Sequence, residues 1–172
     1  MAIEISISAD RELVNTLNRL APTNVYRAVA SASKRAATAA RTAGTKRLRG
    51  IYTIKSGDLK RRAAIKKAGD GSVLEIKGPT ENIKKYKAAK KSYGIFATVK
   101  RGQGVRVPRS FELGGNFLAR EGKARYPLKG IYGPAVPQLF GNPEVLEAME
   151  ERGSEVFESR LYHEIDRLLG GA

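Results

Sequence analysis

The chain has 172 residues, a formal net charge of +15, 41% hydrophobic residues and no cysteine. Its length and apolar content predict one globular domain with a substantial core, and the lack of cysteine excludes disulfides, thiol catalysis and zinc sites built on thiolates. No stretch approaches the roughly 18 consecutive apolar residues of a membrane span, and the start lacks the pattern of a signal peptide, so we expect a protein made in the cytosol and used there or in a particle assembled there.

Three elements are predicted in the N-terminal third. Apolar and polar residues alternate over residues 2–8, which predicts a half-buried strand. Asp10 is a favourable cap for a helix that ends before Pro22. An alanine-rich helix is predicted from about Asn24 to Gly50, and one of its faces carries small apolar residues: Val25, Val29, Ala32, Ala36, Ala40 and Ala43. Such a face allows close approach by a sheet or a helix, either within the chain or between subunits of an oligomer.

Short elements follow the alanine-rich helix. A short basic helix is predicted to begin at Ser56 and to end at about Ala64. The triplet Gly69-Asp70-Gly71 is typical of a hairpin turn. Strands are predicted on both sides of this turn and again further along, at residues 64–67, 72–77, 93–100 and 104–107.

Two further segments of the middle are less regular. Residues 82–92 are dense in lysine and are interpreted as a loop or as one short helix. Residues 111–137 are rich in glycine, proline and aromatic residues, which predicts extended chain with sharp corners. One corner is expected at Gly133-Pro134, and Pro137 is expected to fix a second bend before the last helix.

A long acidic helix is predicted from Pro143 to about Leu169, with one apolar stripe made of Leu146, Met149, Phe157, Leu161, Ile165 and Leu168. Strands grouped between helices favour the α+β class. We therefore expect an antiparallel sheet of about four strands, packed by the alanine-rich helix and the C-terminal helix. The chain is interpreted as one domain, with successive segments 1–22, 23–64, 65–140 and 141–170.

Charge is distributed unevenly along the chain. Residues 51–110 hold 16 basic and 4 acidic residues, a net charge of +12, whereas residues 142–172 hold 3 and 8, a net charge of −5. A basic middle and an acidic end indicate either two different partners or head-to-tail contact between copies of the chain.

The basic middle is a candidate for contact with nucleic acid or for the lining of a channel. The cations that could hold phosphates are Lys84, Lys85, Lys87, Lys90, Lys91, Lys100 and Arg101, with Arg106 and Arg109 nearby. Lysine predominates, which favours sequence-independent contact over the reading of bases. Tyr86 and Tyr93 are interleaved with these cations, and two such rings offer little surface on which bases could stack. The alternative interpretation is a solvated, flexible loop.

The sequence gives little support for catalysis, metal binding or a cofactor. His163 is the only histidine, so a triad or a histidine metal site has no second component. Asp70, Glu75 and Lys77 follow the order in which some metal-dependent nucleases place two carboxylates and a lysine. This short pattern is weak because it arises readily by chance in a lysine-rich chain.

The segment from Arg125 to Gln138 carries the most distinctive pattern of the chain. It resembles a signature of tailed-bacteriophage tail proteins, the minor tail protein Z family and related tail completion proteins. Two further blocks match in order upstream: the alanine-rich helix with the following residues to Lys60, and residues 115–119. The residues that carry the resemblance in the signature itself are Arg125, Pro127, Tyr132, Gly133, Pro134, Pro137 and Gln138.

The resemblance implies a structural virion protein without enzymatic activity or cofactor. Such a protein would complete or terminate the tail at its head-proximal end and would form a ring, commonly of six copies, around the DNA channel. Its partners would be further copies of itself, the tail tube protein, the head-tail joining proteins and, transiently, the genome; no membrane is implied. The alternatives are a sequence-independent DNA-binding protein and, more weakly, the metal-dependent nuclease.

Overall fold

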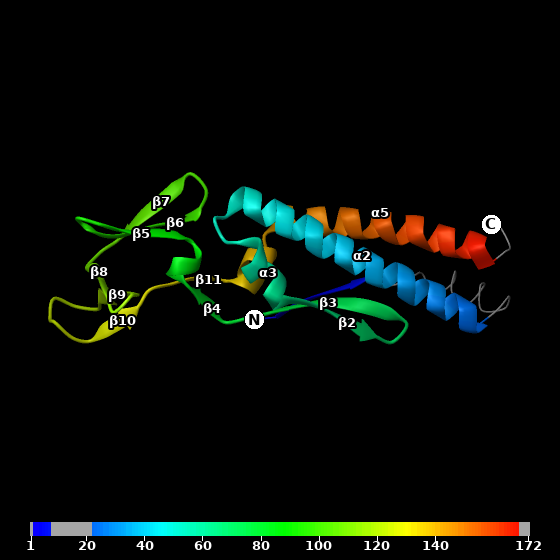
Figure 1. Cartoon of the computed structure of the whole chain (residues 1–172), viewed down its shortest axis with the longest axis horizontal. Coiled ribbons are helices and arrows are strands. Elements are labelled where there is room, and N and C mark those ends of the chain that lie inside the picture. Colours follow the sequence, from blue (N-terminus) through cyan, green and yellow to red (C-terminus); the bar gives the residue numbers. More distant parts are fainter. Residues whose placement is uncertain (1, 8–21, 169–172) are drawn as a thin grey trace.

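The computed structural model describes residues 2–7 and 22–168 and shows an elongated molecule (Figure 1). One half contains two long helices side by side, α2 (Pro22–Ile51) and α5 (Pro143–Leu168), with a small sheet beneath them. The other half consists of short strands. Two short helices, α3 (Ser56–Arg62) and α4 (Val136–Phe140), lie between the halves. The α+β class and both long helices are confirmed.

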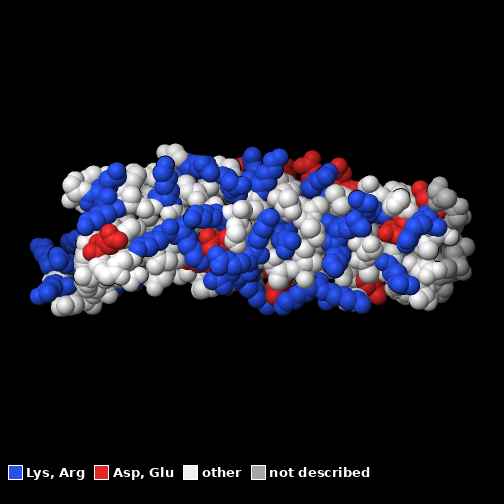
Figure 2. Space-filling model, in the orientation of Figure 1, with Lys and Arg blue, Asp and Glu red and all other residues white. Residues whose placement is uncertain are grey.

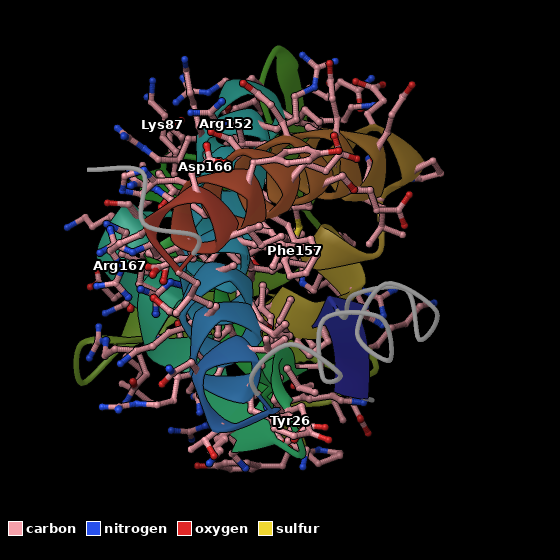
Figure 3. The ribbon with its side chains drawn as sticks, turned by 90° about the vertical axis from the view of Figure 1, so that its right-hand side faces the viewer. Tyr26, Lys87, Arg152, Phe157, Asp166 and Arg167 are labelled. Carbon is pink, nitrogen blue, oxygen red and sulfur yellow. The ribbon has the colours of Figure 1, made fainter. Side chains whose placement is uncertain are left out.

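The alanine-rich face of α2 packs within its own chain. Its residues Val25, Val29, Ala32, Ala36 and Ala40 are buried, and Ala43 is half-buried. Four of the buried residues belong to a cluster with Phe157 and Leu161 of α5, and Figure 3 shows Phe157 pointing inward from α5. The helices come so close at Gly44 that an added Cβ would lie 2.5 Å from Met149 Sδ. The small residues therefore serve a helix–helix contact inside the subunit.

The sheet beneath α2 has the strand order β1-β3-β2, with both pairs antiparallel. Its strands are β1 (Ala2–Ile7), β2 (Ala63–Ala68) and β3 (Gly71–Lys77). The hairpin predicted between β2 and β3 is present, with Ala68 opposite Gly71. The N-terminal strand pairs with β3 of its own chain, and the central strand buries Leu74 and Ile76 against the helices.

The other strands form small antiparallel sheets. One contains β5 (Lys87–Lys91), β6 (Gly94–Lys100) and β7 (Gln103–Val107), and a second contains β8 (Ser110–Leu113), β9 (Asn116–Arg120) and β10 (Leu128–Gly130). A third pairs β4 (Thr80–Asn82) with β11 (Tyr132–Ala135). In place of one sheet of about four strands, the described residues thus form several sheets of two or three strands, because frequent glycines and prolines keep each strand short.

Three predicted local structures need correction or lie outside the description. Residues 82–92 form neither a loop nor a helix alone, because a 3-10 turn, η1 (Ile83–Lys85), is followed by strand β5. Gly133 and Pro134 lie within strand β11 and not at a corner, although the register of this strand is irregular. The helix predicted to begin at Asp10 falls outside the described residues.

The C-terminal helix buries three of the six residues of its predicted stripe, and Leu146 and Ile165 are half-buried. Met149, Phe157 and Leu161 are buried, whereas Leu168 is 37% exposed. Val145 is also fully buried, although it was not predicted as part of the stripe. Among the described ranges 2–7 and 22–168, no helix combines the length and the apolar character needed to cross a membrane.

Candidate interaction surfaces

The lysines of strand β5 lie at the edge of a sheet and do not form one patch. In the described chain β5 pairs only with β6, and its register places Lys87 opposite Thr98 and Lys90 opposite Ile95. Since neighbouring positions of a strand point to opposite faces, Lys87 and Lys90 lie on different sides of the sheet. Lysines on an edge strand also discourage pairing with another chain. Figure 2 shows basic side chains spread over both halves of the molecule.

Lys100 ends β6 and Arg101 begins the turn after it, close to the end of β5 that carries Lys87, because Lys87 lies opposite Thr98. The Arg101 backbone N–H donates to the carbonyl of Ile51 at 2.8 Å, and its Nε donates to the carbonyl of Arg49 at 2.7 Å. A hollow of about 500 Å³ opens beside this contact, with Lys55 among its lining residues. The turn is therefore fixed to the end of α2. Arg101 lines this hollow together with other cations, which the sequence analysis had not predicted to lie beside it.

Lys85 is not available to hold phosphates. Its Nζ lies 2.5 Å from Glu81 Oε2 and 3.7 Å from Asp58 Oδ1, so its charge is already paired. Lys84 is exposed and lies over the ring of Phe117, 4.8 Å from its centre. Of the two cations of η1, only Lys84 faces solvent freely enough to meet an external anion.

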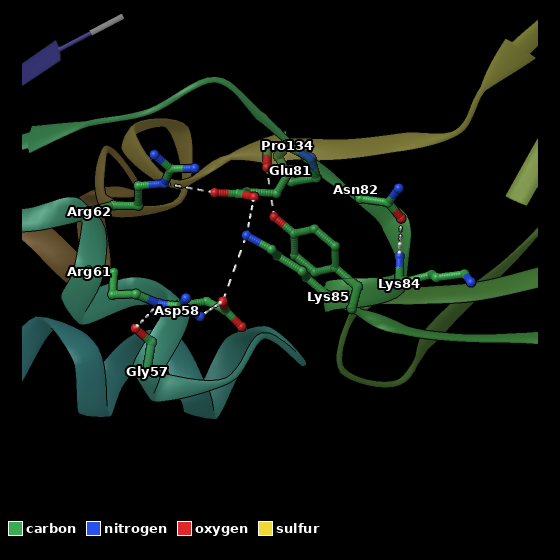
Figure 4. A network of polar contacts seen from close by, with 10 residues as sticks. Gly57, Asp58, Arg61, Arg62, Glu81, Asn82, Lys84, Lys85 and Pro134 are labelled. Carbon is green, nitrogen blue, oxygen red and sulfur yellow. Dashed lines mark hydrogen bonds and ion pairs between the residues drawn. The ribbon is translucent and has the colours of Figure 1, made fainter. Parts of the chain in front are cut away.

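An ion-pair network connects α3 with β4 and η1 (Figure 4). We call it the Glu81 network; its members are Asp58, Arg61, Arg62, Glu81 and Lys85. Glu81 is 4% exposed, and its second oxygen accepts a hydrogen bond from Arg62 Nε at 3.0 Å. Sequence analysis missed this network, although the four-residue spacing of Glu81 and Lys85 is a signal for an ion pair.

The pKa of Glu81 follows from two opposed effects. Burial favours the neutral acid and raises the pKa, but hydrogen bonds and charge attraction from Lys85 and Arg62 outweigh it, so the pKa of Glu81 lies below its usual value of 4.5. The folded protein thus holds Glu81 ionised. The ionised carboxylate joins α3, which lies between the halves, to strand β4, because Arg62 ends α3 while Glu81 lies in β4.

Tyr86 packs directly on the segment that carries the tail-protein signature. It is 3% exposed, and its hydroxyl donates to the carbonyl of Pro134 at 2.6 Å. Burial, followed by the negative charge of Glu81, raises the pKa of this hydroxyl, which therefore stays protonated as a donor. A Cβ added at Gly133 would lie 2.4 Å from Tyr86 Cε2. Only glycine allows the ring to lie against the strand here.

The signature residues divide into buried and exposed groups. Gly133 and Pro137 are buried and Pro134 is half-buried. Gln138 is exposed, but its Oε1 accepts a hydrogen bond from the backbone N–H of Ala135 at 2.9 Å and so caps α4. The other exposed signature residues, which do not cap a helix, are Arg125, Pro127 and Tyr132; Tyr132 is 59% exposed.

The three blocks that carry the resemblance meet in one core. A single buried cluster contains Leu48 and Leu59 from the first block, Phe117 from the second and Val136 from the third, and Ile131 of the third block packs against it half-buried. The second and third blocks are also joined by the backbone hydrogen bond from the N–H of residue 131 to the carbonyl of residue 117, at 3.1 Å. No family model, curated protein or solved structure matches the chain.

The residues weighed for catalysis are not arranged as a metal site. Asp70 lies in the turn between β2 and β3, and Glu75 is held by the ammonium groups of Lys77 at 2.5 Å and Lys66 at 2.6 Å. Hydrogen bonds from these lysines lower the pKa of Glu75. His163 is exposed on α5. Within the described part of the chain, no three histidine, aspartate or glutamate side chains group as metal ligands.

Replacing Glu81 by glutamine is expected to destabilise the fold by about 2 kcal/mol at neutral pH, since two partly exposed cations lose their buried partner. The folded state lowers the pKa of Glu81, so the unfolded chain binds the proton more tightly and acid favours unfolding. The greater stability of the wild type over Glu81→Gln should be fully present at pH values above 4.5, the ordinary pKa of a glutamate. It should decline as the pH falls below that value. Urea unfolding at a series of pH values measures this.

Glu121→Gln is the matched control for Glu81→Gln, because Glu121 pairs with Lys129 at 3.6 Å on the surface. It should change stability by less than about 0.5 kcal/mol. A difference between the wild type and Glu81→Gln that stays constant down to about pH 3 would contradict the assigned role of the charge.

Proposed function

We propose that this protein is a structural component of a phage tail that completes the tail at its head-proximal end as a ring of identical copies. The observation that carries the proposal is the order of three signature blocks along the chain, together with their convergence in one buried core. Blocks that pack on one another act as one structural unit, which supports a resemblance in fold and not a chance likeness of separate segments.

The distribution of charge supports assembly from copies of the chain. Residues 142–172 carry a net charge of −5 in a chain whose total is +15. A surface that meets a different surface on the next copy generates a ring or a filament. In the proposed ring, six copies surround the channel, the tail tube and head-tail joining proteins bind its two ends, and exposed lysines such as Lys87 and Lys91 contact the passing genome.

A sequence-independent DNA-binding protein is the second candidate, favoured by the many exposed cations. The two candidates differ in the affinity of the single subunit for duplex DNA. A dedicated binder that neutralises several phosphates binds tightly at about 50 mM salt and loses about a thousandfold in affinity at about 200 mM.

A titration of fluorescent duplex DNA at these two salt concentrations tests the proposal. For a tail component we expect only weak binding, with a dissociation constant above about 1 µM at the higher salt, and no cleavage with magnesium present. The variant Lys87→Gln/Lys91→Gln should lower this weak affinity only slightly. Tight, steeply salt-dependent binding by the monomer would contradict the tail proposal and favour the DNA-binding protein.

A further inference from the structure

A basic groove runs along one side of the α2/α5 pair. It is an open hollow of about 920 Å³, and its cations come from both helices: Lys34, Arg35 and Lys46 from α2, and Arg152 and Arg160 from α5. Among the residues that the structure describes, no acidic one lines it. Its apolar surface comes from small or branched side chains, Ala39, Ala43 and Val156. We call this hollow the α2/α5 groove.

Most cations of the groove are available to a partner. Within the described residues, Lys34, Arg35, Lys46 and Arg160 form no ion pair, and all four are exposed. Arg152 pairs with Glu155 of the same helix at 2.6 Å, and Figure 3 shows Arg152 on the outer side of α5, away from Phe157. Unpaired cations above an apolar floor suit an elongated acidic partner whose body covers the floor.

The outer face of α5 has the complementary charge. Carboxylates recur there at spacings that place them on one side of a helix, and all are exposed: Glu144, Glu147, Glu151, Glu155, Glu158 and Asp166. We call them the acidic stripe. Val145, Met149, Phe157 and Leu161 lie on the opposite, buried face. Glu144 is already paired with Arg47 of α2 and Glu155 with Arg152. Like charges four residues apart, such as Glu147 and Glu151, destabilise a helix by about 0.2–0.5 kcal/mol per pair, so the other carboxylates of the stripe oppose the folding of their own helix.

The groove matches the central part of the stripe, from Glu147 to Glu158, in length. Twelve residues separate Lys34 from Lys46, which corresponds to about 18 Å along a helix. Eleven residues separate Glu147 from Glu158, which corresponds to about 17 Å. An α-helix laid in the groove could therefore place a carboxylate near the cations along its whole length.

We propose that the α2/α5 groove of one copy receives the acidic stripe of α5 from a second copy. The inference rests on the proposed function, because it names the contact that would build the ring. The two surfaces differ, so each copy offers one groove and one stripe, and the contact repeats head to tail. A helix is favoured over nucleic acid because it covers Ala39, Ala43 and Val156, whereas a phosphate backbone would leave this apolar floor in water.

Two neutralised variants test the contact. The groove variant is Lys34→Gln/Arg35→Gln/Lys46→Gln, and the stripe variant is Glu147→Gln/Glu151→Gln/Glu158→Gln. Each should weaken self-association at least about tenfold, as expected for the loss of several ion pairs. The matched control removes three exposed cations elsewhere, Lys60→Gln/Lys67→Gln/Lys123→Gln, and should assemble as the wild type does. Circular dichroism checks that every variant remains folded.

Mixing the two variants gives the sharpest result. The stripe variant keeps its groove and the groove variant keeps its stripe, so they should form one-to-one heterodimers that grow no further. Native mass spectrometry measures this. Absence of heterodimers, or assembly of both variants at wild-type mass, would overturn the contact while the ring stands. Loss of DNA affinity in the groove variant at unchanged mass would instead identify nucleic acid as the occupant and overturn it.

The mass of the wild type separates the contact from the ring. A wild-type dimer that both variants break would support the pairing of groove with stripe as a reciprocal two-fold contact, and would contradict its head-to-tail repeat in a ring. A wild-type monomer at about 100 µM would overturn both.

Discussion

Gly133→Val is expected to destabilise the folded protein by about 3 kcal/mol, with a fall in melting temperature of about 10 °C for a chain of this size. Residue 133 lies in strand β11, where backbone preference alone would favour valine. The added Cβ would lie 2.4 Å from Tyr86 Cε2 and 2.8 Å from Cδ2. Tyr86 cannot move aside easily, because it is buried and its hydroxyl is held by the carbonyl of Pro134.

Three further variants test whether the contact with Tyr86 causes the effect of Gly133→Val. Gly57→Val adds the same atoms where no heavy atom lies within 4 Å, and should change stability by less than about 1 kcal/mol. Tyr132→Ala, at an exposed neighbour, should likewise leave stability within about 1 kcal/mol. Tyr86→Leu removes the ring, so the cost of valine at residue 133 should fall by about 1 kcal/mol in the double variant. Equal costs of Gly133→Val with and without the ring would show that the Tyr86 contact is not the reason.

Phe140→Ala is expected to destabilise the protein by about 4 kcal/mol, the typical effect of emptying a buried phenylalanine site. Phe140 is fully buried at the end of α4, in the cluster that also contains Met149 of α5 and Leu74 of β3. Its ring also reaches α2, because a Cβ added at Gly44 would lie 3.1 Å from Phe140 Cε1. One side chain thus reaches α2 and belongs to a cluster that also holds residues of α5 and of the sheet beneath the helices.

Chemical denaturation at fixed protein concentration measures the effect of Phe140→Ala, since self-association would otherwise add to the apparent stability. Leu113→Ala is the control, because Leu113 is 57% exposed in strand β8, and it should lose less than about 1 kcal/mol. A loss below about 1.5 kcal/mol for Phe140→Ala would mean that the surrounding elements close the cavity, and that this ring is not a main support of the helical half.

The long helix α2 and the β2–β3 hairpin were predictable because their sequence patterns are strong. The spacing of small residues in α2 predicted a helix and its buried face, and Gly69-Asp70-Gly71 predicted the β2–β3 hairpin; both are confirmed. Strand β5 was missed because five residues with three lysines have low strand propensity. Its pairing with β6 decides its structure, and such pairing is not visible in the segment itself.

The candidate surfaces were harder to predict than the fold. Sequence density of lysine suggested one patch, but alternation along β5 separates Lys87 from Lys90, and ion pairs occupy Lys85. The Glu81 network depends on α3 and β4 coming together, which no local pattern specifies. The sequence marked the signature segment as distinctive. Its packing on Tyr86 could not be predicted, because only the fold brings these two segments together. The ring, its partners and its place on the tail stay proposals.

Assembly into a ring is tested by the native mass of the purified protein at low and moderate salt, combined with negative-stain images of any oligomer. We expect a closed ring with a central hole, made of about six copies, whose population falls as salt screens the charged contacts. A protein that remains monomeric at both salt concentrations up to about 100 µM would contradict assembly into a ring.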